Sequence, residues 1–341
     1  MHFCAPGKTG AEVPVMNYKK IAQIANVSVS TVSKALSGSK EVSDELAKRI
    51  IDIAMSGGYF EEKGKRKIEY TNEKELSIAV VCPEIVSIEY AREITAIKRA
   101  VEARSAVAAV YVYDFDCEKL DKIIKTLTVR NCADGIVLFP MNNSIFETPI
   151  PIVTISSQLC KYDSVSCSNQ TYFDEIVSYL KNLGHKRIAF VGESLTISKQ
   201  NCFCRSMEKF GLTCNEDDMY TISERFERIG YAAAEKMLKK ELPTAVVCAY
   251  DEIALAMIHS FKDHGVSVPA DISVIGINDI PSAAYSQLPL TTVRTFQEDQ
   301  GEILVKLLYD KIFGKSQLVQ HITVDPELVV RKSTGRARTA E

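Results

Sequence analysis

The chain has 341 residues, 46% of them hydrophobic, and a formal net charge of −3. This length predicts two or three domains, and the apolar fraction with balanced charge is typical of a soluble globular protein with a sizeable core. Apolar runs stay well short of the ~20 residues that cross a bilayer, and the N-terminus lacks a secretion signal, so we expect a cytoplasmic protein without a membrane partner.

The first fifteen residues show no periodicity and are broken by Pro6, Gly7, Gly10 and Pro14. Such a stretch is not expected to pack into a domain. Two interpretations stay open for residues 1–15: an upstream start-codon assignment, with Met16 as the true start, or a disordered leader.

Residues 21–37 are the first strongly patterned stretch. Apolar or small residues keep helical spacing for about one turn, and Asn26-Val27-Ser28 then interrupts the pattern. Asn26 adopts a left-handed turn at low cost, and Ser28 can cap a second helix whose Val32 and Leu36 lie one turn apart. Two short helices joined by a tight turn are predicted.

The second of these helices leaves Val29, Ser30, Ser33 and Lys34 exposed. Short hydroxyls, a methyl-bearing side chain and one long cation suit base edges, thymine methyls and phosphates in a DNA groove. An ordinary helical hairpin in a packed core is the alternative.

Residues 41–54 predict a third helix, capped by Ser43 and carrying the apolar stripe Leu46, Ile50 and Ile53. The segment 16–68 holds ten Lys or Arg and six Asp or Glu, a net charge of +4, which leaves −7 after Ile68. A basic head on an acidic body indicates a polyanion as the partner of the head.

Residues 61–74 are nearly all charged and are typical of a solvated linker. Beyond Leu76, short apolar runs alternate with helical stretches, a rhythm that predicts parallel sheets covered on both faces. About eight strands suit two smaller doubly wound lobes. The predicted strands are 76–82, 108–114, 135–139, 150–156, 187–192, 218–223, 244–249 and 272–277, and the predicted helices are 89–104, 118–131, 170–183, 199–210, 227–240 and 251–264.

The ten cysteines are scattered, and without an export signal reduced thiols are expected. Cys202, Cys204 and Cys214 form the one cluster, for which a metal or redox role is the alternative to ordinary buried residues. The chain lacks His-Glu-x-x-His, Gly-x-Ser-x-Gly and phosphate-loop motifs. We therefore expect no enzyme, metal or cofactor, with a cysteine-dependent enzyme as a remote alternative.

Several spaced motifs together resemble the LacI/GalR family of bacterial transcription regulators. The head shows Ile21-Ala-x-x-Ala-x-Val-Ser-x-Ser-Thr-Val-Ser-Lys-Ala-Leu-Ser-Gly38, then Val42-Ser43 and Gly58-Tyr59. The body adds Asp134-Gly-Ile-Val, Leu183-Gly-His-Lys-Arg-Ile-Ala-Phe-Val-Gly192, Val268-Pro-Ala-Asp-Ile-Ser-Val-Ile-Gly-Ile-Asn278 and Pro289-Leu-Thr-Thr-Val-Arg294. The resemblance implies a small all-α helix-turn-helix domain followed by a two-lobed α/β core like a periplasmic binding protein, with two doubly wound parallel sheets.

The resemblance also implies a division of the chain. The expected parts are a DNA-binding domain at 16–60, a hinge at 61–74, an effector-binding core at 75–334 and a tail at 335–341. Within the core, lobe 1 is expected at about 75–167 and 291–315, and lobe 2 at about 168–290 and 316–334.

In this family the hinge folds into a short helix on the operator and inserts a leucine into the minor groove. By resemblance Ile68 stands at that position and Arg66 at a usual arginine. The usual Pro-Asn start is replaced by Glu61-Glu62, and Gly64 inside a helix costs roughly 1 kcal/mol. A linker that never forms the hinge helix stays open.

Two sets of residues in the head are expected to contact DNA. The base-reading candidates are Val29, Ser30 and Lys34, and the family usually has arginine where Lys34 stands. The phosphate-contacting candidates are Lys19, Lys20, Thr31, Ser33 and Lys40.

Carried over position by position, the family's effector pocket falls on Tyr90, Lys199, Phe226, Tyr250, Asp251, Asn278 and Phe296. Lys199, Tyr250 and Asn278 replace the usual arginine, asparagine and aspartate, which makes a hexose held by fork and carboxylate less expected. A flatter or more apolar effector, an anion bound by Lys199, or no effector at all remain open. Asp251 as a helix cap and Tyr90 or Phe296 as core aromatics are the structural alternatives.

The resemblance implies a homodimeric regulator of a pseudo-palindromic DNA operator, with repression as the expected direction and a small-molecule effector between the lobes. One alternative is a regulator with a degenerate cleft that answers to a protein partner or to its own concentration. Another is a solute-binding protein with a vestigial head.

Overall fold

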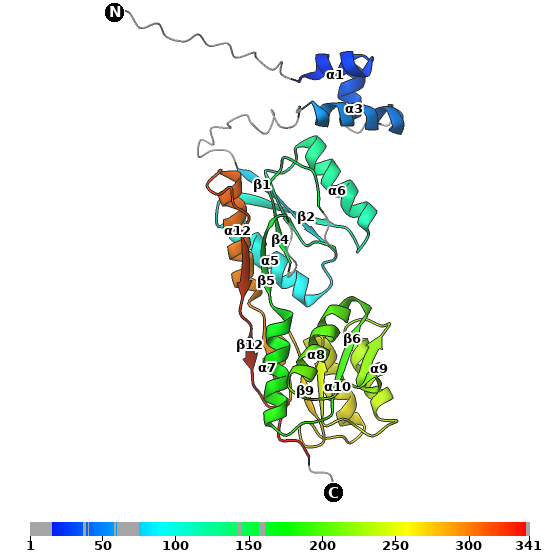
Figure 1. Ribbon diagram of the computed structural model, residues 1–341, viewed down its shortest axis with the longest axis vertical. Helices are drawn as coiled ribbons and strands as arrows, with labels where there is room; N and C mark the ends of the chain where they lie inside the picture. The colour runs from blue at the N-terminus through cyan, green and yellow to red at the C-terminus, as the bar shows by residue number, and fades with distance from the viewer. Residues whose placement is uncertain are drawn as a thin grey trace, which may run out of the picture.

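The computed structural model describes residues 16–36, 39, 41–57, 59, 75–141, 145–156 and 161–338. Figure 1 shows a helical head at one end of the long axis, followed by two α/β lobes. The predicted leader 1–15 and hinge 61–74 lie outside the described residues.

The head contains three helices, α1 (Tyr18–Ala25), α2 (Val29–Leu36) and α3 (Asp44–Ser56). Asn26 ends α1 in the left-handed conformation, with φ 54°, and the Ser28 Oγ accepts from the Thr31 backbone N at 3.0 Å. Both local predictions are confirmed. Ser43 stands at the N-cap of α3, but its side chain makes no capping hydrogen bond, so its predicted capping role is wrong.

A small apolar core closes the head. Ile21, Val32 and Ile50 are fully buried, and Leu46 and Ile53 pack against them while partly exposed. The three helices therefore fold around one another, which excludes the alternative of a helical hairpin within the core of a larger domain.

Lobe 1 is built on one parallel sheet in the order β11-β5-β4-β3-β1-β2. Its strands are β1 (Leu76–Cys82), β2 (Ala106–Val112), β3 (Gly135–Leu138), β4 (Ile152–Ile155), β5 (Asp163–Cys167) and β11 (His321–Val324), and its helices are α5 (Ile88–Glu102), α6 (Cys117–Arg130) and α12 (Gln297–Ile312). Apolar clusters lie between the sheet and α5 with α12, and between the sheet and α6. Both faces of the sheet are thus covered, as predicted.

The expected assignment of 316–334 to lobe 2 is wrong for β11. This strand pairs in parallel with β5, placing His321 opposite Ser164, and the Gln320 backbone N donates to Asp163 Oδ1 at 2.7 Å. One edge of β5 pairs with β4. β11 pairs with the other edge and provides hydrogen-bond partners for the backbone groups there.

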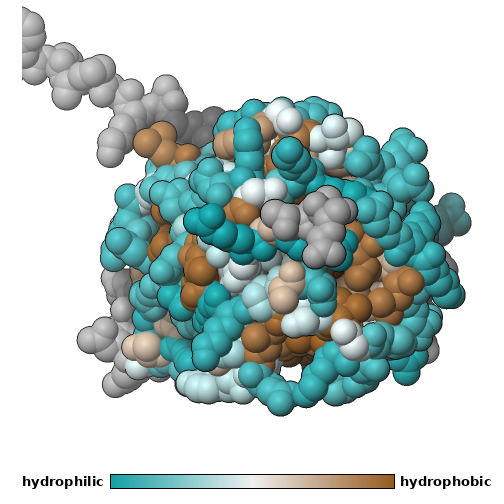
Figure 2. Space-filling model, turned by 90° about the horizontal axis from the view of Figure 1, so that it is seen from below, coloured by the Kyte–Doolittle hydropathy of each residue, from teal (hydrophilic) through white to brown (hydrophobic). Residues whose placement is uncertain are grey.

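Lobe 2 holds a four-stranded parallel sheet in the order β7-β6-β8-β9. Its elements are α7 (Asn169–Asn182), β6 (Ile188–Glu193), η1 (Ser194–Thr196), α8 (Ile197–Lys209), η2 (Glu216–Asp218), β7 (Met219–Ile222), α9 (Glu227–Met237), β8 (Ala245–Cys248), α10 (Asp251–Asp263), β9 (Ser273–Ile275) and α11 (Pro281–Tyr285). Figure 2 looks at the molecule from below and shows mainly polar residues with apolar patches between them.

A short antiparallel pair, β10 (Thr292–Arg294) with β12 (Glu327–Val329), joins the lobes. The chain beyond it packs on lobe 2: the Ala337 backbone N donates to Leu183 O at 2.9 Å, and buried His185 places Nε2 3.0 Å from Gly335 O. Burial lowers the pKa of His185, so the neutral ring serves as a structural link.

Cys204 and Cys214 are joined in a disulfide, with Cα atoms 5.4 Å apart. The expectation of reduced thiols is therefore wrong for this pair, which ties α8 to the loop after it. Within the described part of the chain, no helix combines the length and the apolar character needed to cross a membrane.

Candidate DNA-binding head and inter-lobe cleft

Helix α2 has an apolar inner side and a polar outer side. Val32 and Leu36 are buried in the head core, while Ser30, Ser33 and Lys34 are exposed and Val29 is 43% exposed. The structure thus brings the three base-reading candidates together on one accessible helix face, as a major groove requires.

The polar groups of this face have partners within the head. The Ser28 hydroxyl lies 2.7 Å from both the Ser30 and Thr31 hydroxyls, and Lys34 forms an ion pair with Glu41. These bonds are solvent-exposed and easily exchanged, so Lys34 has to leave Glu41 before it can reach DNA.

Two phosphate candidates stand at the N-terminus of α1. Lys19 is exposed and Lys20 is half-buried, and the Lys20 backbone N donates to Asn17 Oδ1 at 3.1 Å. A helix N-terminus with added lysines favours an anion such as a phosphate. Lys40, Arg66 and Ile68 lie outside the described residues.

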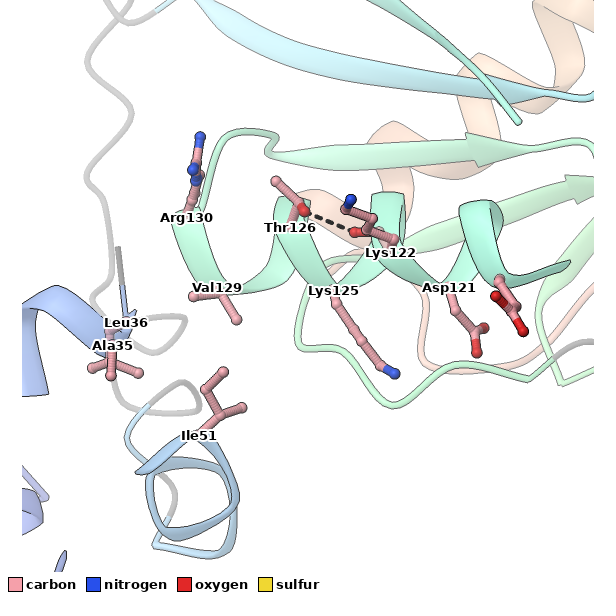
Figure 3. Close-up of a pocket in the computed structure, with 10 residues that line it drawn as sticks. Ala35, Leu36, Ile51, Asp121, Lys122, Lys125, Thr126, Val129 and Arg130 are labelled. Atoms are coloured by element: carbon pink, nitrogen blue, oxygen red, sulfur yellow. Dashed lines mark hydrogen bonds between the residues drawn. The ribbon is translucent and has the colours of Figure 1, made fainter. Parts of the chain in front are cut away.

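A hollow of about 490 Å³ lies between the head and α6 of lobe 1, and Figure 3 shows residues that line it. Leu36 and Ile51 of the head line one side, and Val129, Lys125 and Arg130 of α6 line the other. Ala35 and Leu36 at the C-terminal end of α2 face α6 across this hollow, while Ser30, Ser33 and Lys34 on the outer side of α2 stay exposed.

A second hollow, the inter-lobe cleft, has a volume of about 330 Å³ and is lined from both lobes. Helix α5 and the ends of β4 and β5 contribute from lobe 1, and α8 and the segment after β9 contribute from lobe 2. Ligands in parallel α/β sheets bind at the carboxyl ends of strands. Of the predicted effector residues, Tyr90, Lys199 and Asn278 line this cleft.

Tyr90 lies in the first turn of α5, where its backbone N donates to the capping Ser87 Oγ at 3.3 Å. Its ring meets Phe139 edge to face, with centroids 5.7 Å apart. Burial raises the pKa of the Tyr90 hydroxyl, with nearby carboxylates adding to the effect. The phenol therefore stays protonated and can donate to a ligand.

Lys199 is already compensated by protein groups. Its Nζ donates to Ala249 O at 3.2 Å, lies 3.8 Å from Glu89 Oε2 and sits 4.6 Å from the centre of the Tyr250 ring. This environment argues against the alternative in which Lys199 binds an anionic effector.

Four predicted effector residues do not line the cleft. The Tyr250 ring contacts Lys199 on one side and the Phe226 ring on another, with the two ring centroids 6.4 Å apart. Phe296 stands directly before α12, with φ 54°. Asp251 is fully buried, and its carboxylate accepts from Ile280 and Thr292 instead of capping its own helix. The role predicted for Asp251 as a ligand contact is wrong, because both oxygens face protein donors.

Sequence reasoning missed Glu89 and Glu93, which line the cleft from α5. They are four residues apart and therefore share one helix face. Their spacing beside Tyr90 was a usable signal, because Tyr90 had already been placed at the cleft.

Two arginines bridge the lobes beside the cleft. Arg225 of lobe 2 donates to both Glu84 oxygens of lobe 1, at 2.6 and 2.9 Å, and to Glu193 Oε2 at 3.2 Å. Arg92 of α5 donates to the backbone oxygens of Asn278 and Asp279 at 2.9 and 3.1 Å. We call the Arg225–Glu84 pair the latch.

Replacing Glu84 by glutamine should open the lobes of the unliganded protein. The charge-assisted fork is lost, which costs the closed form about 1–2 kcal/mol given the partial exposure of Arg225. Small-angle X-ray scattering should show a larger radius of gyration. Glu102→Gln, which removes the Lys98–Glu102 pair within α5, is the matched control, and an unchanged radius for Glu84→Gln would contradict the latch.

Two family models match the chain. Residues 17–61 match the bacterial regulatory proteins of the lacI family, and residues 177–334 match the periplasmic binding protein-like domain. Together they cover the head and much of the body, including α8 and the segment after β9.

Curated relatives align along nearly the whole chain. The HTH-type transcriptional regulator DegA of Bacillus subtilis is 28% identical over 335 residues, covering 94% of this chain and 98% of the relative. The transcriptional repressor CytR of Escherichia coli K12 is 26% identical over 331 residues, covering 93% and 95%.

Solved structures share the fold at lower identity. The lac repressor dimer bound to operator and the anti-inducer ONPF has a TM-score of 0.68 and 20% identity, covering 94% of this chain and 100% of that one. A complex of the regulator CelR with cellobiose has a TM-score of 0.66 and 20% identity, covering 93% and 99%. With its helix-turn-helix head and periplasmic-binding-protein-like body, the chain belongs to the LacI family of bacterial regulatory proteins.

Proposed function

We propose that this LacI-type transcriptional regulator represses from a pseudo-palindromic operator as a homodimer and answers to a small molecule in the inter-lobe cleft. The exposed polar face of α2, fixed on a closed three-helix core, is the observation that carries the DNA-binding role. Because bacterial operator DNA lies in the cytoplasm, the proposed regulator acts there. The proposed role needs no catalytic step.

A dimer is proposed because one head of this size makes too few contacts for tight specific binding. Lobe 1 offers a suitable surface at strand β2, the edge of its sheet, where Val107 and Val110 are 48% and 44% exposed. Exposed apolar residues on a sheet edge favour packing against a second copy.

Effector control is proposed to work by a population shift. The cleft is lined from both lobes, so a ligand that contacts both favours one degree of closure. The change in closure then alters how well two heads reach successive half-sites. Gel shifts on the DNA upstream of the protein's own gene, with and without a metabolite panel, test this function. If the protein binds no DNA there, the proposed function is refuted.

The head offers a sharper test. Ser30→Ala should change base preference in a selection from randomised operators, because a good base contact contributes about 1–3 kcal/mol of discrimination. Lys20→Ala should weaken all sequences about equally and reduce the salt dependence by about one ion. Lys236→Ala on α9 is an exposed lysine remote from the head and serves as control. The reverse pattern for Ser30 and Lys20 would refute the assignment of α2.

A further inference from the structure

The wall of the inter-lobe cleft carries more negative than positive charge. Glu89 and Glu93 line it from α5, and Lys199 lines it from α8. Lys199 is held by Ala249 O at 3.2 Å and lies 3.8 Å from Glu89. One carboxylate is therefore left without a compensating lysine on the wall.

Three hydrogen-bond donors on the wall are directed at protein acceptors. Tyr172 donates to Asn169 Oδ1 at 2.9 Å, and Asn278 Nδ2 donates to Glu89 Oε2 at 3.2 Å. Gln300 Nε2 likewise donates to the backbone oxygen of Thr295 at 2.5 Å. A ligand that brings mainly acceptors finds these donors already engaged.

One acceptor of the wall is left without a donor. Asn278 is only 2% exposed, and among the described residues its Oδ1 has no hydrogen-bond partner. The backbone holds Asn278 in place at φ 107°, with its N donating to Val293 O at 2.9 Å. A buried unpaired carbonyl oxygen is costly and is rare in native structures, so it points to a donor supplied by a ligand.

Glu93 also favours a positively charged ligand. Its side chain is buried, and burial together with Glu89 raises its pKa, which Lys199 and Arg92 only partly oppose. A cation in the cleft would stabilise the ionised forms of Glu89 and Glu93, which line the cleft.

We propose that the cleft binds a small primary amine as its ammonium form. Its three N–H donors match the carboxylates of Glu89 and Glu93 and the Asn278 carbonyl oxygen, and the volume of about 330 Å³ is at the lower end for a small-molecule site. The inference rests on the proposed function, because it names the effector class of the same cleft.

Isothermal titration calorimetry on the full-length protein without DNA tests this. The probes are D-glucosamine, ethanolamine and tyramine, each paired with its N-acetyl derivative, and D-glucuronate as an anion. At least one amine should bind at least ~10-fold more tightly than its acetylated partner, because acetylation removes the charge. A panel in which no amine is preferred, or in which D-glucuronate binds best, would overturn the proposal.

Variants locate the ammonium group. Glu93→Gln and Glu89→Gln should each weaken the preferred amine by ~10-fold or more and leave the weak binding of its N-acetyl form unchanged, whereas Glu235→Gln, an exposed glutamate on α9, should change neither. Thermal unfolding checks that the variants fold. Unchanged amine affinity in folded Glu93→Gln and Glu89→Gln contradicts the site. Gel shifts without ligand distinguish the two proposals. If the protein binds DNA but prefers no amine, the amine proposal fails and the proposed function stands.

Discussion

Ile21→Ala should abolish specific DNA binding. Ile21 is fully buried among the three helices of the head, and truncating a buried isoleucine costs about 2–5 kcal/mol. A core in a domain this small rarely supplies more than about 3–5 kcal/mol. The head should therefore unfold, and α2 loses the support that presents Ser30 and Lys34. Gel shifts and the thermal unfolding of the head measure both effects.

Ile24→Ala is the matched control, since Ile24 lies on the same helix and is 49% exposed. Its head should keep the unfolding transition of the parent chain. The body of Ile21→Ala should also unfold at the parent temperature, because the lobes have their own cores. Operator binding at parental affinity by Ile21→Ala would show that the head does not depend on this core.

The head was predictable because its signals are local. Asn26 and Ser28 act within a few residues of their own positions, and the apolar spacing of α2 fixes which side is buried. The long apolar strands of the body follow equally from local sequence, as in β1, where nearly every residue is buried.

The strands that were missed depend on distant partners. β5 is Asp-Ser-Val-Ser-Cys and β11 is His-Ile-Thr-Val, neither of them a continuous apolar run. β5 is a strand because β4 and β11 pair with it, and β11 is a strand because β5 pairs with it. His321 of β11 and Ser164 of β5 are 157 residues apart in the chain. Pairing at that separation is not visible in a local window.

The cleft was predicted in part for a similar reason. A resemblance places Tyr90, Lys199 and Asn278 near a ligand, but it cannot say that Asp251 turns its carboxylate inward or that Glu89 neutralises Lys199. Side-chain direction and charge pairing depend on packing between the lobes. The anion site was one of the open alternatives, and the contacts of Lys199 and the two glutamates on the wall argue against it.

Asp251→Ala should strongly destabilise the body. Asp251 is fully buried, and its carboxylate accepts from the Ile280 backbone N at 2.8 Å and from the Thr292 hydroxyl at 2.5 Å. Alanine leaves both donors buried without acceptors, at about 1–3 kcal/mol each. Thr292 begins β10, which pairs with β12 between the lobes. The lost hydrogen bonds therefore destabilise the β10–β12 connection as well as lobe 2.

Asp251→Asn should lose much less stability, because its amide oxygen still accepts one of the two hydrogen bonds. Asp263→Ala removes an exposed carboxylate at the other end of α10, 3.8 Å from His259, and should change stability by less than about 0.5 kcal/mol. Thermal and denaturant unfolding of the full chain measure all three. If Asp251→Ala unfolded like the parent chain and lost only ligand binding, Asp251 would be an effector contact. The buried hydrogen bonds instead require that Asp251→Ala is far less stable than Asp251→Asn, and that Asp251→Asn is less stable than the parent chain.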